Sequence, residues 1–109
     1  MNEKSNNNLQ LNLSELYQLI QDKANSLDQN SYSKKLVQSE VNLVAQKIGE
    51  EGVEVAISAL DHDRKQTPET KNEIIKEVAD LFYHTTALLV KYDIKFSDIF
   101  HEFYLRNKK

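Results

Sequence analysis

Two pairs of acidic residues, each with a spacing of three, are the feature of this sequence that is best suited to chemistry. The first pair is Glu51 and Glu54, and the second is Glu77 and Asp80; we call these four residues the acidic cluster. Residues three apart lie on the same face of an α-helix. Each pair adjoins the apolar positions of its segment, so we expect the carboxylates to point into a core-facing groove.

The two pairs can meet if their segments form an antiparallel helical hairpin. Glu51 lies about 15 residues before the centre of the polar stretch near residues 65–66, and Asp80 lies about 15 residues after it. Helices joined by a short loop pack antiparallel, so equal distances from the loop bring residues side by side. The four carboxylates are therefore predicted to converge near the middle of the hairpin.

Converging carboxylates need a cation, because like charges repel and an unpaired buried carboxylate is strongly destabilising. The sequence contains no cysteine and no clear histidine pair, and oxygen ligands alone favour Mg²⁺ or Mn²⁺ over Zn²⁺. Mg²⁺ commonly shares its ligand sphere with substrate phosphates, which indicates a phosphate-group reaction. The alternative is that the glutamates are solvated, or paired with Lys47 and Lys76 on a helix surface.

The composition favours an all-α protein with one domain. Of 109 residues only two are glycine and one is proline, which leaves few turn signals, whereas good helix formers are abundant. A hydrophobic content of 39% with 28% charged residues is typical of a globular chain. We expect residues 1–10 to be a flexible polar tail and residues 11–109 to form the domain.

Four or five helices are expected, and two of them are long. Asn12 can cap the first helix with Glu15 at its third position, Ser31 or Ser33 can cap the second, and Thr67 followed by Pro68 is the clearest start. The expected spans are about residues 13–27, from 31 or 33 to 60, 68–91, and from 96 onward, with a polar loop at 61–66.

The third expected helix is roughly 35 Å long at 1.5 Å per residue and pairs with the second in the hairpin. His84 continues the row of Glu77 and Asp80; a lone histidine there is more often packed in a core or interface than in contact with substrate or metal. The inward positions of the first helix are expected to be Leu16, Leu19, Ile20 and Leu27, and those of the third Ile74, Ile75, Val78, Leu81, Phe82, Thr85, Leu88 and Leu89.

Two further features concern the surroundings of the hairpin. Gly49 and Gly52 are poor choices for a helix interior, which indicates room for a close neighbour or a phosphate beside the acidic cluster. A single hairpin leaves apolar faces that a second copy would cover. We therefore expect a homodimeric helical bundle.

Charge and hydropathy argue against several classes of partner. The net charge is −3 and no Lys/Arg run exceeds two residues, so nucleic acid is not an expected partner. The longest apolar run, residues 87–90, is far short of the roughly 20 residues that span a bilayer, so no membrane partner is expected. The N-terminus lacks the apolar core of a signal peptide, and the lack of cysteine fits a reducing compartment. We expect a cytoplasmic protein.

The spacing of the acidic cluster resembles the signature of the all-α nucleoside triphosphate pyrophosphohydrolases, a superfamily that includes MazG-type enzymes and dimeric dUTPases. Three segments narrow the resemblance: SYSKKL at 31–36, AQKIGEE at 45–51 and EVADLFYH at 77–84. They are similar to segments of the phosphoribosyl-ATP pyrophosphohydrolases, and the similarity covers about residues 12–106.

This resemblance implies a helical fold that dimerises, dependence on Mg²⁺, and cleavage of the α–β phosphoanhydride of phosphoribosyl-ATP, which is the second step of histidine biosynthesis. By position the acidic cluster matches the metal-binding carboxylates of the family, and Glu50 of the same motif is a candidate helper or general base. Lys35 and Lys47 match family lysines and can each meet a phosphate. Lys47 can equally pair with a glutamate one turn away, and Lys34 is expected to be solvated.

Departures from the family pattern are small, since Ser33 stands where threonine is usual and Gly52 where alanine or glycine occurs. The chain contains no cyclohydrolase domain and none of the zinc-binding cysteines of such a domain, which predicts the monofunctional form. Two alternatives stay open. One is a house-cleaning enzyme of the same fold that hydrolyses noncanonical nucleoside triphosphates, and the other is a non-enzymatic helical adaptor whose acidic faces are solvated.

Overall fold

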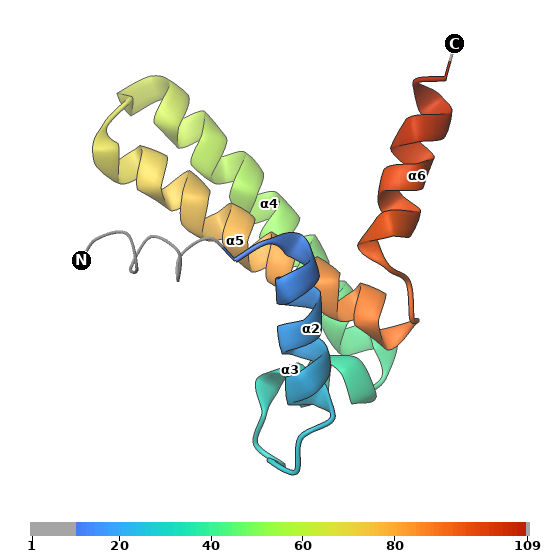
Figure 1. The fold of residues 1–109 in the computed structure, drawn as a ribbon. Coiled ribbons are helices and arrows are strands. Elements are labelled where there is room, and N and C mark those ends of the chain that lie inside the picture. The colour runs from blue at the N-terminus through green and yellow to red at the C-terminus, as the bar shows by residue number, and fades with distance from the viewer. Residues whose placement is uncertain (1–10, 109) are drawn as a thin grey trace, which may run out of the picture.

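The structure is a computed structural model that describes residues 11–108, and this part of the chain is all helical, as the sequence predicts (Figure 1). The polar tail expected at residues 1–10 lies outside the described residues. The helices are α2 (Leu13–Ala24), α3 (Tyr32–Gln38), α4 (Val41–Lys65), α5 (Pro68–Lys91) and α6 (Phe96–Arg106).

Three helix starts are confirmed because local side chains satisfy the free backbone N–H groups. The Asn12 side chain accepts from the Glu15 backbone N–H at 2.8 Å, while the Glu15 carboxylate accepts from the Asn12 backbone N–H at 3.0 Å. Ser31 caps α3. Thr67 caps α5 with Pro68 in its first turn.

The prediction of one continuous helix from Ser31 or Ser33 to Leu60 is wrong, because the chain breaks between α3 and α4. Ser39 and Glu40 adopt extended backbone conformations. The Lys91 ammonium, from the end of α5, donates to the Val37 carbonyl at 3.0 Å and also to the Ser39 carbonyl. A distant side chain thus satisfies the carbonyls that a continuing helix would have used.

Two other boundaries also differ from expectation. The first helix ends at Ala24, and Leu27, expected to face inward, is 93% exposed. The expected loop at 61–66 is mostly helical, since α4 continues to Lys65 before Gln66 takes a left-handed conformation. Basic residues in that last turn stabilise the negative end of the helix dipole, which explains why a polar segment stays helical.

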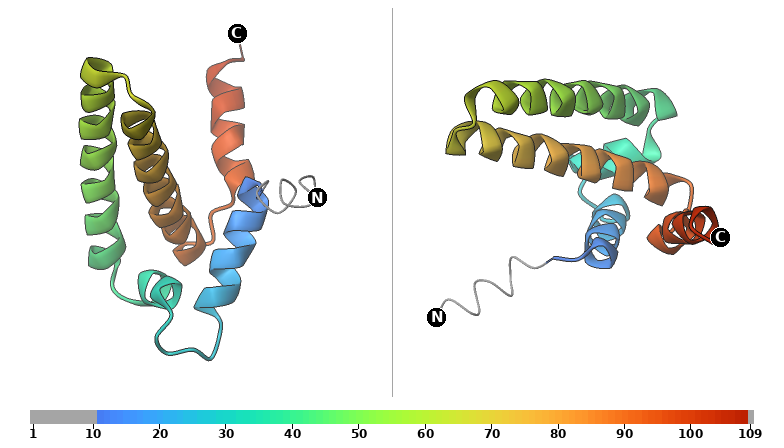
Figure 2. Two further views of the ribbon diagram at one scale, coloured as in Figure 1. Left: turned by 90° about the vertical axis from the view of Figure 1, so that its left-hand side faces the viewer. Right: turned by 90° about the horizontal axis from the view of Figure 1, so that it is seen from above.

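The two long helices α4 and α5 form the predicted antiparallel hairpin, and α2 and α3 pack against its open end (Figures 1 and 2). The core lies at that end, where Ile20, Leu36, Val44 and Ala87 are fully buried. Toward its tip, the hairpin leaves large apolar side chains exposed to solvent. Ile75 and Phe82, expected to face inward on α5, are 58% and 50% exposed.

Helix α6 projects away from the rest of the chain and buries none of its residues (Figure 2). Its apolar side chains Phe100, Phe103 and Tyr104 are about half exposed. The radius of gyration is 16.2 Å, compared with about 13 Å for a compact chain of this length. The open shape leaves the long hairpin and α6 accessible. Among the described residues, no helix combines the length and apolar character that crossing a membrane requires.

Candidate metal and substrate site

The hairpin brings three members of the acidic cluster into one group. One carboxylate oxygen from each of Glu51, Glu77 and Asp80 lies within 4.8 Å of the other two. Glu51 comes from α4, and Glu77 and Asp80 come from α5, so the group bridges the two helices. Glu54, the fourth member, is exposed on α4 outside this group, but its carboxyl contributes to the raised pKa values of Glu51 and Glu77.

Two oxygens of this group have no partner among the described residues. Glu51 Oε1 and Glu77 Oε1 are both buried and accept no hydrogen bond. A buried acceptor without a donor is rare, because it has lost its hydration without replacement. The two oxygens lie where the sequence predicts a cation.

The raised pKa values of two cluster carboxylates also indicate that the cluster would be stabilised by a positive charge. The pKa of Glu77 is raised from 4.5 to about 7, first by a hydrogen bond with the Glu54 carboxyl, then by desolvation and by repulsion from the other carboxylates. The pKa of Glu51 is also raised, mainly by desolvation and then by the charges of Glu54 and Asp80. A proton shared between carboxyls offsets part of the repulsion, and a divalent cation would offset more. The donor set therefore fits a hard divalent ion.

Lys47 and Glu50 pair with each other at the edge of the cluster. Lys47 Nζ lies 3.7 Å from Glu50 Oε1, and Gln46 Nε2 donates to Glu50 Oε2 at 3.0 Å. The bond from Gln46 is the largest cause of a lowered Glu50 pKa, and the Lys47 charge adds to it. Glu50 is thus ionised and exposed beside the cluster. Lys47 also acts on Glu51 through its charge.

His84 is packed, as the sequence predicts, and it pairs with Tyr32, which the sequence does not single out, beside the cluster. His84 is buried; its Nδ1 lies 2.8 Å from the Asp80 carbonyl and its Nε2 lies 2.7 Å from the Tyr32 hydroxyl. A carbonyl only accepts, so Nδ1 donates, and in the neutral ring Nε2 accepts from the phenol. His84 is therefore packed and hydrogen-bonded. It connects α3 to the turn of α5 that carries Asp80.

The surroundings of Tyr32 place it against the same site. Its ring stacks on Tyr83 with centroids 6.4 Å apart. The pKa of its hydroxyl is raised, first by desolvation, while Lys47 acts to lower it and Glu51 and Asp80 act to raise it. Tyr32 and His84 are 52 residues apart in sequence, and no local pattern pairs them.

The two lysines of α3 have different environments. Lys34 is partly buried and donates to the Ser26 carbonyl at 2.8 Å, so the expectation that it is solvated is wrong. Lys35 is exposed on α3. Its proposed contact with a phosphate stays a prediction.

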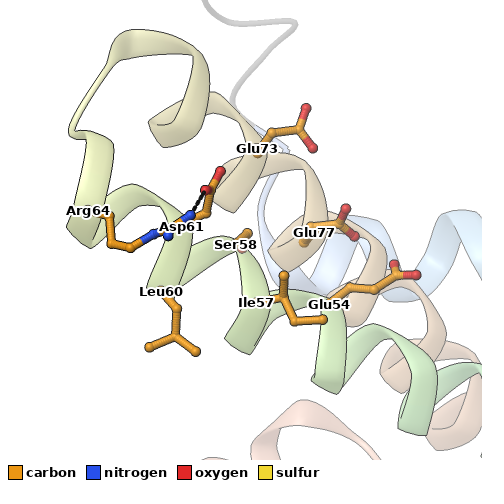
Figure 3. A pocket seen from close by; sticks show the side chains of 8 residues that line it. All are labelled: Glu54, Ile57, Ser58, Leu60, Asp61, Arg64, Glu73 and Glu77. Carbon is orange, nitrogen blue, oxygen red and sulfur yellow. Dashed lines mark hydrogen bonds and ion pairs between the residues drawn. The ribbon is translucent and has the colours of Figure 1, made fainter.

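A cavity of about 490 Å³ continues from the acidic cluster toward the tip of the hairpin (Figure 3). Glu54 and Glu77 lie at one end of it, and Arg64 lies at the other. Ile57 and Leu60 of α4 provide apolar wall between them. The cavity thus combines carboxylates from both helices of the hairpin with apolar surface and a guanidinium from α4.

The two glycines of α4 leave open space beside the cluster. A Cβ added at Gly49 or at Gly52 would meet no atom within 4 Å. No close neighbour among the described residues explains either glycine. The space that they leave is available to a ligand or to another chain.

Fold and site together define an all-α protein whose helical hairpin carries a carboxylate group suited to a divalent cation. A model of the phosphoribosyl-ATP pyrophosphohydrolase family matches residues 13–107. The chain belongs to this family.

Individual relatives agree with this assignment. The chain is 36% identical over 97 residues to a phosphoribosyl-ATP pyrophosphatase of Clostridium acetobutylicum. The aligned residues make up 89% of this chain and 82% of that protein. It is 40% identical over 96 residues to the histidine biosynthesis bifunctional protein HisIE of Campylobacter jejuni, covering 88% of this chain but 43% of that protein. The chain therefore spans less than half the length of this bifunctional relative.

Proposed function

We propose that this protein hydrolyses the α–β phosphoanhydride of phosphoribosyl-ATP and releases phosphoribosyl-AMP and pyrophosphate, as a step of histidine biosynthesis. The single observation that carries the proposal is the carboxylate group of Glu51, Glu77 and Asp80, in a chain that matches the phosphoribosyl-ATP pyrophosphohydrolase family over residues 13–107. Its unpartnered oxygens on Glu51 and Glu77 support the proposal, because they are acceptors suited to a cation.

We propose Mg²⁺, with Mn²⁺ as a substitute, as that cation. Glu51, Glu77 and Asp80 would hold it, and Glu54, whose carboxyl helps to raise the pKa of Glu77, would complete the set. When bound, such an ion neutralises charge on substrate phosphates and makes a bound water more acidic.

The residues around the cluster have separate roles in this proposal. Glu50 is an ionised carboxylate at the edge of the cluster, and its position makes it the candidate to accept the proton that the attacking water loses as the new phosphorus–oxygen bond forms and the bond to pyrophosphate breaks. Its lowered pKa makes it a weaker base than an ordinary glutamate. Lys47, beside Glu50 and Glu51, offsets negative charge on the departing pyrophosphate. His84 fixes the turn that carries Asp80 through its bond to the Asp80 carbonyl.

An assay of pyrophosphate release tests the reaction. Purified protein is given phosphoribosyl-ATP, or members of a panel of ordinary and noncanonical nucleoside triphosphates, with and without Mg²⁺. We expect phosphoribosyl-ATP to be the preferred substrate and activity to require the ion. Comparable turnover of ordinary deoxynucleoside triphosphates with none of phosphoribosyl-ATP would reject the proposal in favour of a house-cleaning enzyme.

We also propose that two copies form a homodimer. Large apolar side chains are exposed on three helices, for example Val53 on α4, Ile75 on α5 and Phe103 on α6, and apolar surface of this extent commonly marks an interface. Light scattering across a range of protein concentrations tests this, and a monomer at every concentration contradicts it. The cytoplasmic location expected from the sequence stays a prediction.

A further inference from the structure

The cavity beside the acidic cluster has a charge pattern that the hydrolysis step does not use. Arg64 is the cation among the described residues that line it, and Glu54 and Glu77 line the opposite end (Figure 3). Ten residues of helix separate Glu54 from Arg64, which corresponds to roughly 15 Å along the axis of α4. The cavity therefore offers an anion-binding group several helical turns from the reacting phosphates.

Each of the two carboxylates that line the cavity near Arg64 has a lysine partner. Asp61 lies 3.4 Å from Arg64 and 3.5 Å from Lys65, so two cations share one carboxylate. Glu73, on the facing helix, lies 3.7 Å from Lys76. Among the residues that line the cavity, Asp61, Glu73 and Arg64 lie toward the tip and Glu54 and Glu77 lie at the other end, so the tip is the less acidic end of the cavity.

Arg64 is also free to change partner. Its side chain is 75% exposed, and the contact with Asp61 is a single exposed pair, which contributes little stability. A phosphate offers a guanidinium two parallel hydrogen bonds, which are stronger than one exposed contact at 3.4 Å. A phosphate at this end of the cavity would therefore compete with Asp61 for the Arg64 guanidinium.

The groups along α4 follow an order that matches the parts of one molecule. Lys47 lies on one side of the acidic cluster, and the cavity lies on the other. Beyond the cluster come the apolar walls Ile57 and Leu60, and then Arg64. Phosphoribosyl-ATP has a triphosphate, a purine between two ribose rings, and a single phosphate at its far end.

We infer that the substrate lies along α4, with its triphosphate at the acidic cluster and Lys47, its purine against Ile57 and Leu60, and its far phosphate on Arg64. This inference rests on the proposed function and deepens it. Arg64 is then the residue that distinguishes phosphoribosyl-ATP from ATP, because ATP lacks the far phosphate. A site that binds a phosphate through a guanidinium rejects ligands without it by losing two charge-assisted hydrogen bonds.

The test compares Arg64→Gln with Lys65→Gln, since both residues contact Asp61 and only Arg64 lines the cavity. KM for phosphoribosyl-ATP should rise about tenfold or more in Arg64→Gln, the effect of losing a charged hydrogen bond. KM in Lys65→Gln should stay near the wild-type value. Arg64→Lys should fall between wild type and Arg64→Gln, because it keeps the charge without the planar fork.

Titration calorimetry with phosphoribosyl-AMP and with AMP isolates the far phosphate from the reaction. Arg64→Gln should weaken binding of phosphoribosyl-AMP about tenfold and leave AMP unaffected. Equal binding of phosphoribosyl-AMP by wild type and Arg64→Gln, or an equal loss for AMP, would overturn the inference while wild-type turnover of phosphoribosyl-ATP upholds the proposed function. Failure of the wild type to hydrolyse phosphoribosyl-ATP would overturn both.

Discussion

The two ends of the α4–α5 hairpin differ in how well their side chains are packed and in whether their polar groups have partners. At the open end, α2 and α3 cover the hairpin, and Ile20, Leu36, Val44 and Ala87 are fully buried. From the middle to the tip, the hairpin has exposed apolar residues, repelling carboxylates and a cavity of about 490 Å³. The well-packed end stabilises the fold, so the other end can keep polar groups without partners. Functional sites are commonly found where such groups are kept.

Leu36→Ala should have the largest effect on stability, because Leu36 is fully buried between α3 and the hairpin. Removing a buried leucine side chain costs about 2–5 kcal/mol of unfolding free energy. Ile75→Ala, near the tip, is the matched variant, since its side chain is 58% exposed. Urea denaturation at one fixed protein concentration measures both. Equal losses would mean that the tip is as well packed as the core, as a tight dimer across α5 would produce.

Glu51→Gln should have the reverse profile, with a large effect on activity and little on stability. The substitution keeps the shape of the side chain and removes charge from a group in which Glu51 Oε1 has no partner. The amide can donate to a neighbouring carboxylate, so unfolding without metal should occur at an equal or higher urea concentration. Pyrophosphate release should fall roughly 100-fold or more.

Glu69→Gln is the control for charge alone, because Glu69 is an exposed acid in the first turn of α5, outside the cluster. It should keep near wild-type activity. A Glu51→Gln variant with full activity would remove Glu51 from the metal site.

The free energy of unfolding should depend on pH through Glu77 of the acidic cluster, a contribution that the apolar core at the open end does not make. The Glu77 pKa is raised from 4.5 to about 7, so between these values the folded state binds more protons than the unfolded state at this group. In the absence of metal, the contribution of Glu77 to the free energy of unfolding therefore falls as the pH rises through this window. Mg²⁺ competes with the same proton, so its stabilising effect should be absent near pH 4.5 and grow toward neutral pH.

Thermal melting with and without Mg²⁺ measures this, with Glu77→Gln as the reference that removes the titrating group. The difference between the melting temperatures of wild type and Glu77→Gln at each pH removes the contribution of titrating groups elsewhere in the protein. A wild type that follows the same pH profile as Glu77→Gln would exclude a raised Glu77 pKa.

The sequence predicts those parts of the fold that local chemistry determines. Thr67 and Pro68 mark the start of α5 because capping needs only neighbouring residues. The hairpin and the convergence of its carboxylates follow from helix periodicity and loop position, so Glu51 and Asp80 are found together as expected. These features need no knowledge of a distant contact.

The remaining features depend on contacts between distant residues. The break after Gln38 relies on Lys91, whose ammonium reaches the Val37 carbonyl 54 residues away in sequence. The bond between Tyr32 and His84 joins residues 52 apart. Periodicity does not encode such pairs, and for this reason the α3–α4 break and the tyrosine–histidine contact escape prediction from sequence.

Gly49→Ala should have the smallest effect, and its sign is informative. Alanine at this exposed position in the interior of α4 would meet no atom within 4 Å, and it favours a helix over glycine by about 1 kcal/mol. We expect the variant to unfold at a slightly higher urea concentration. If it also keeps full activity and the same oligomeric state, the glycine has no role in the site. If stability rises while KM for phosphoribosyl-ATP also rises, the space beside Gly49 belongs to the substrate, and the functional half of the hairpin gives up helix stability to keep it open.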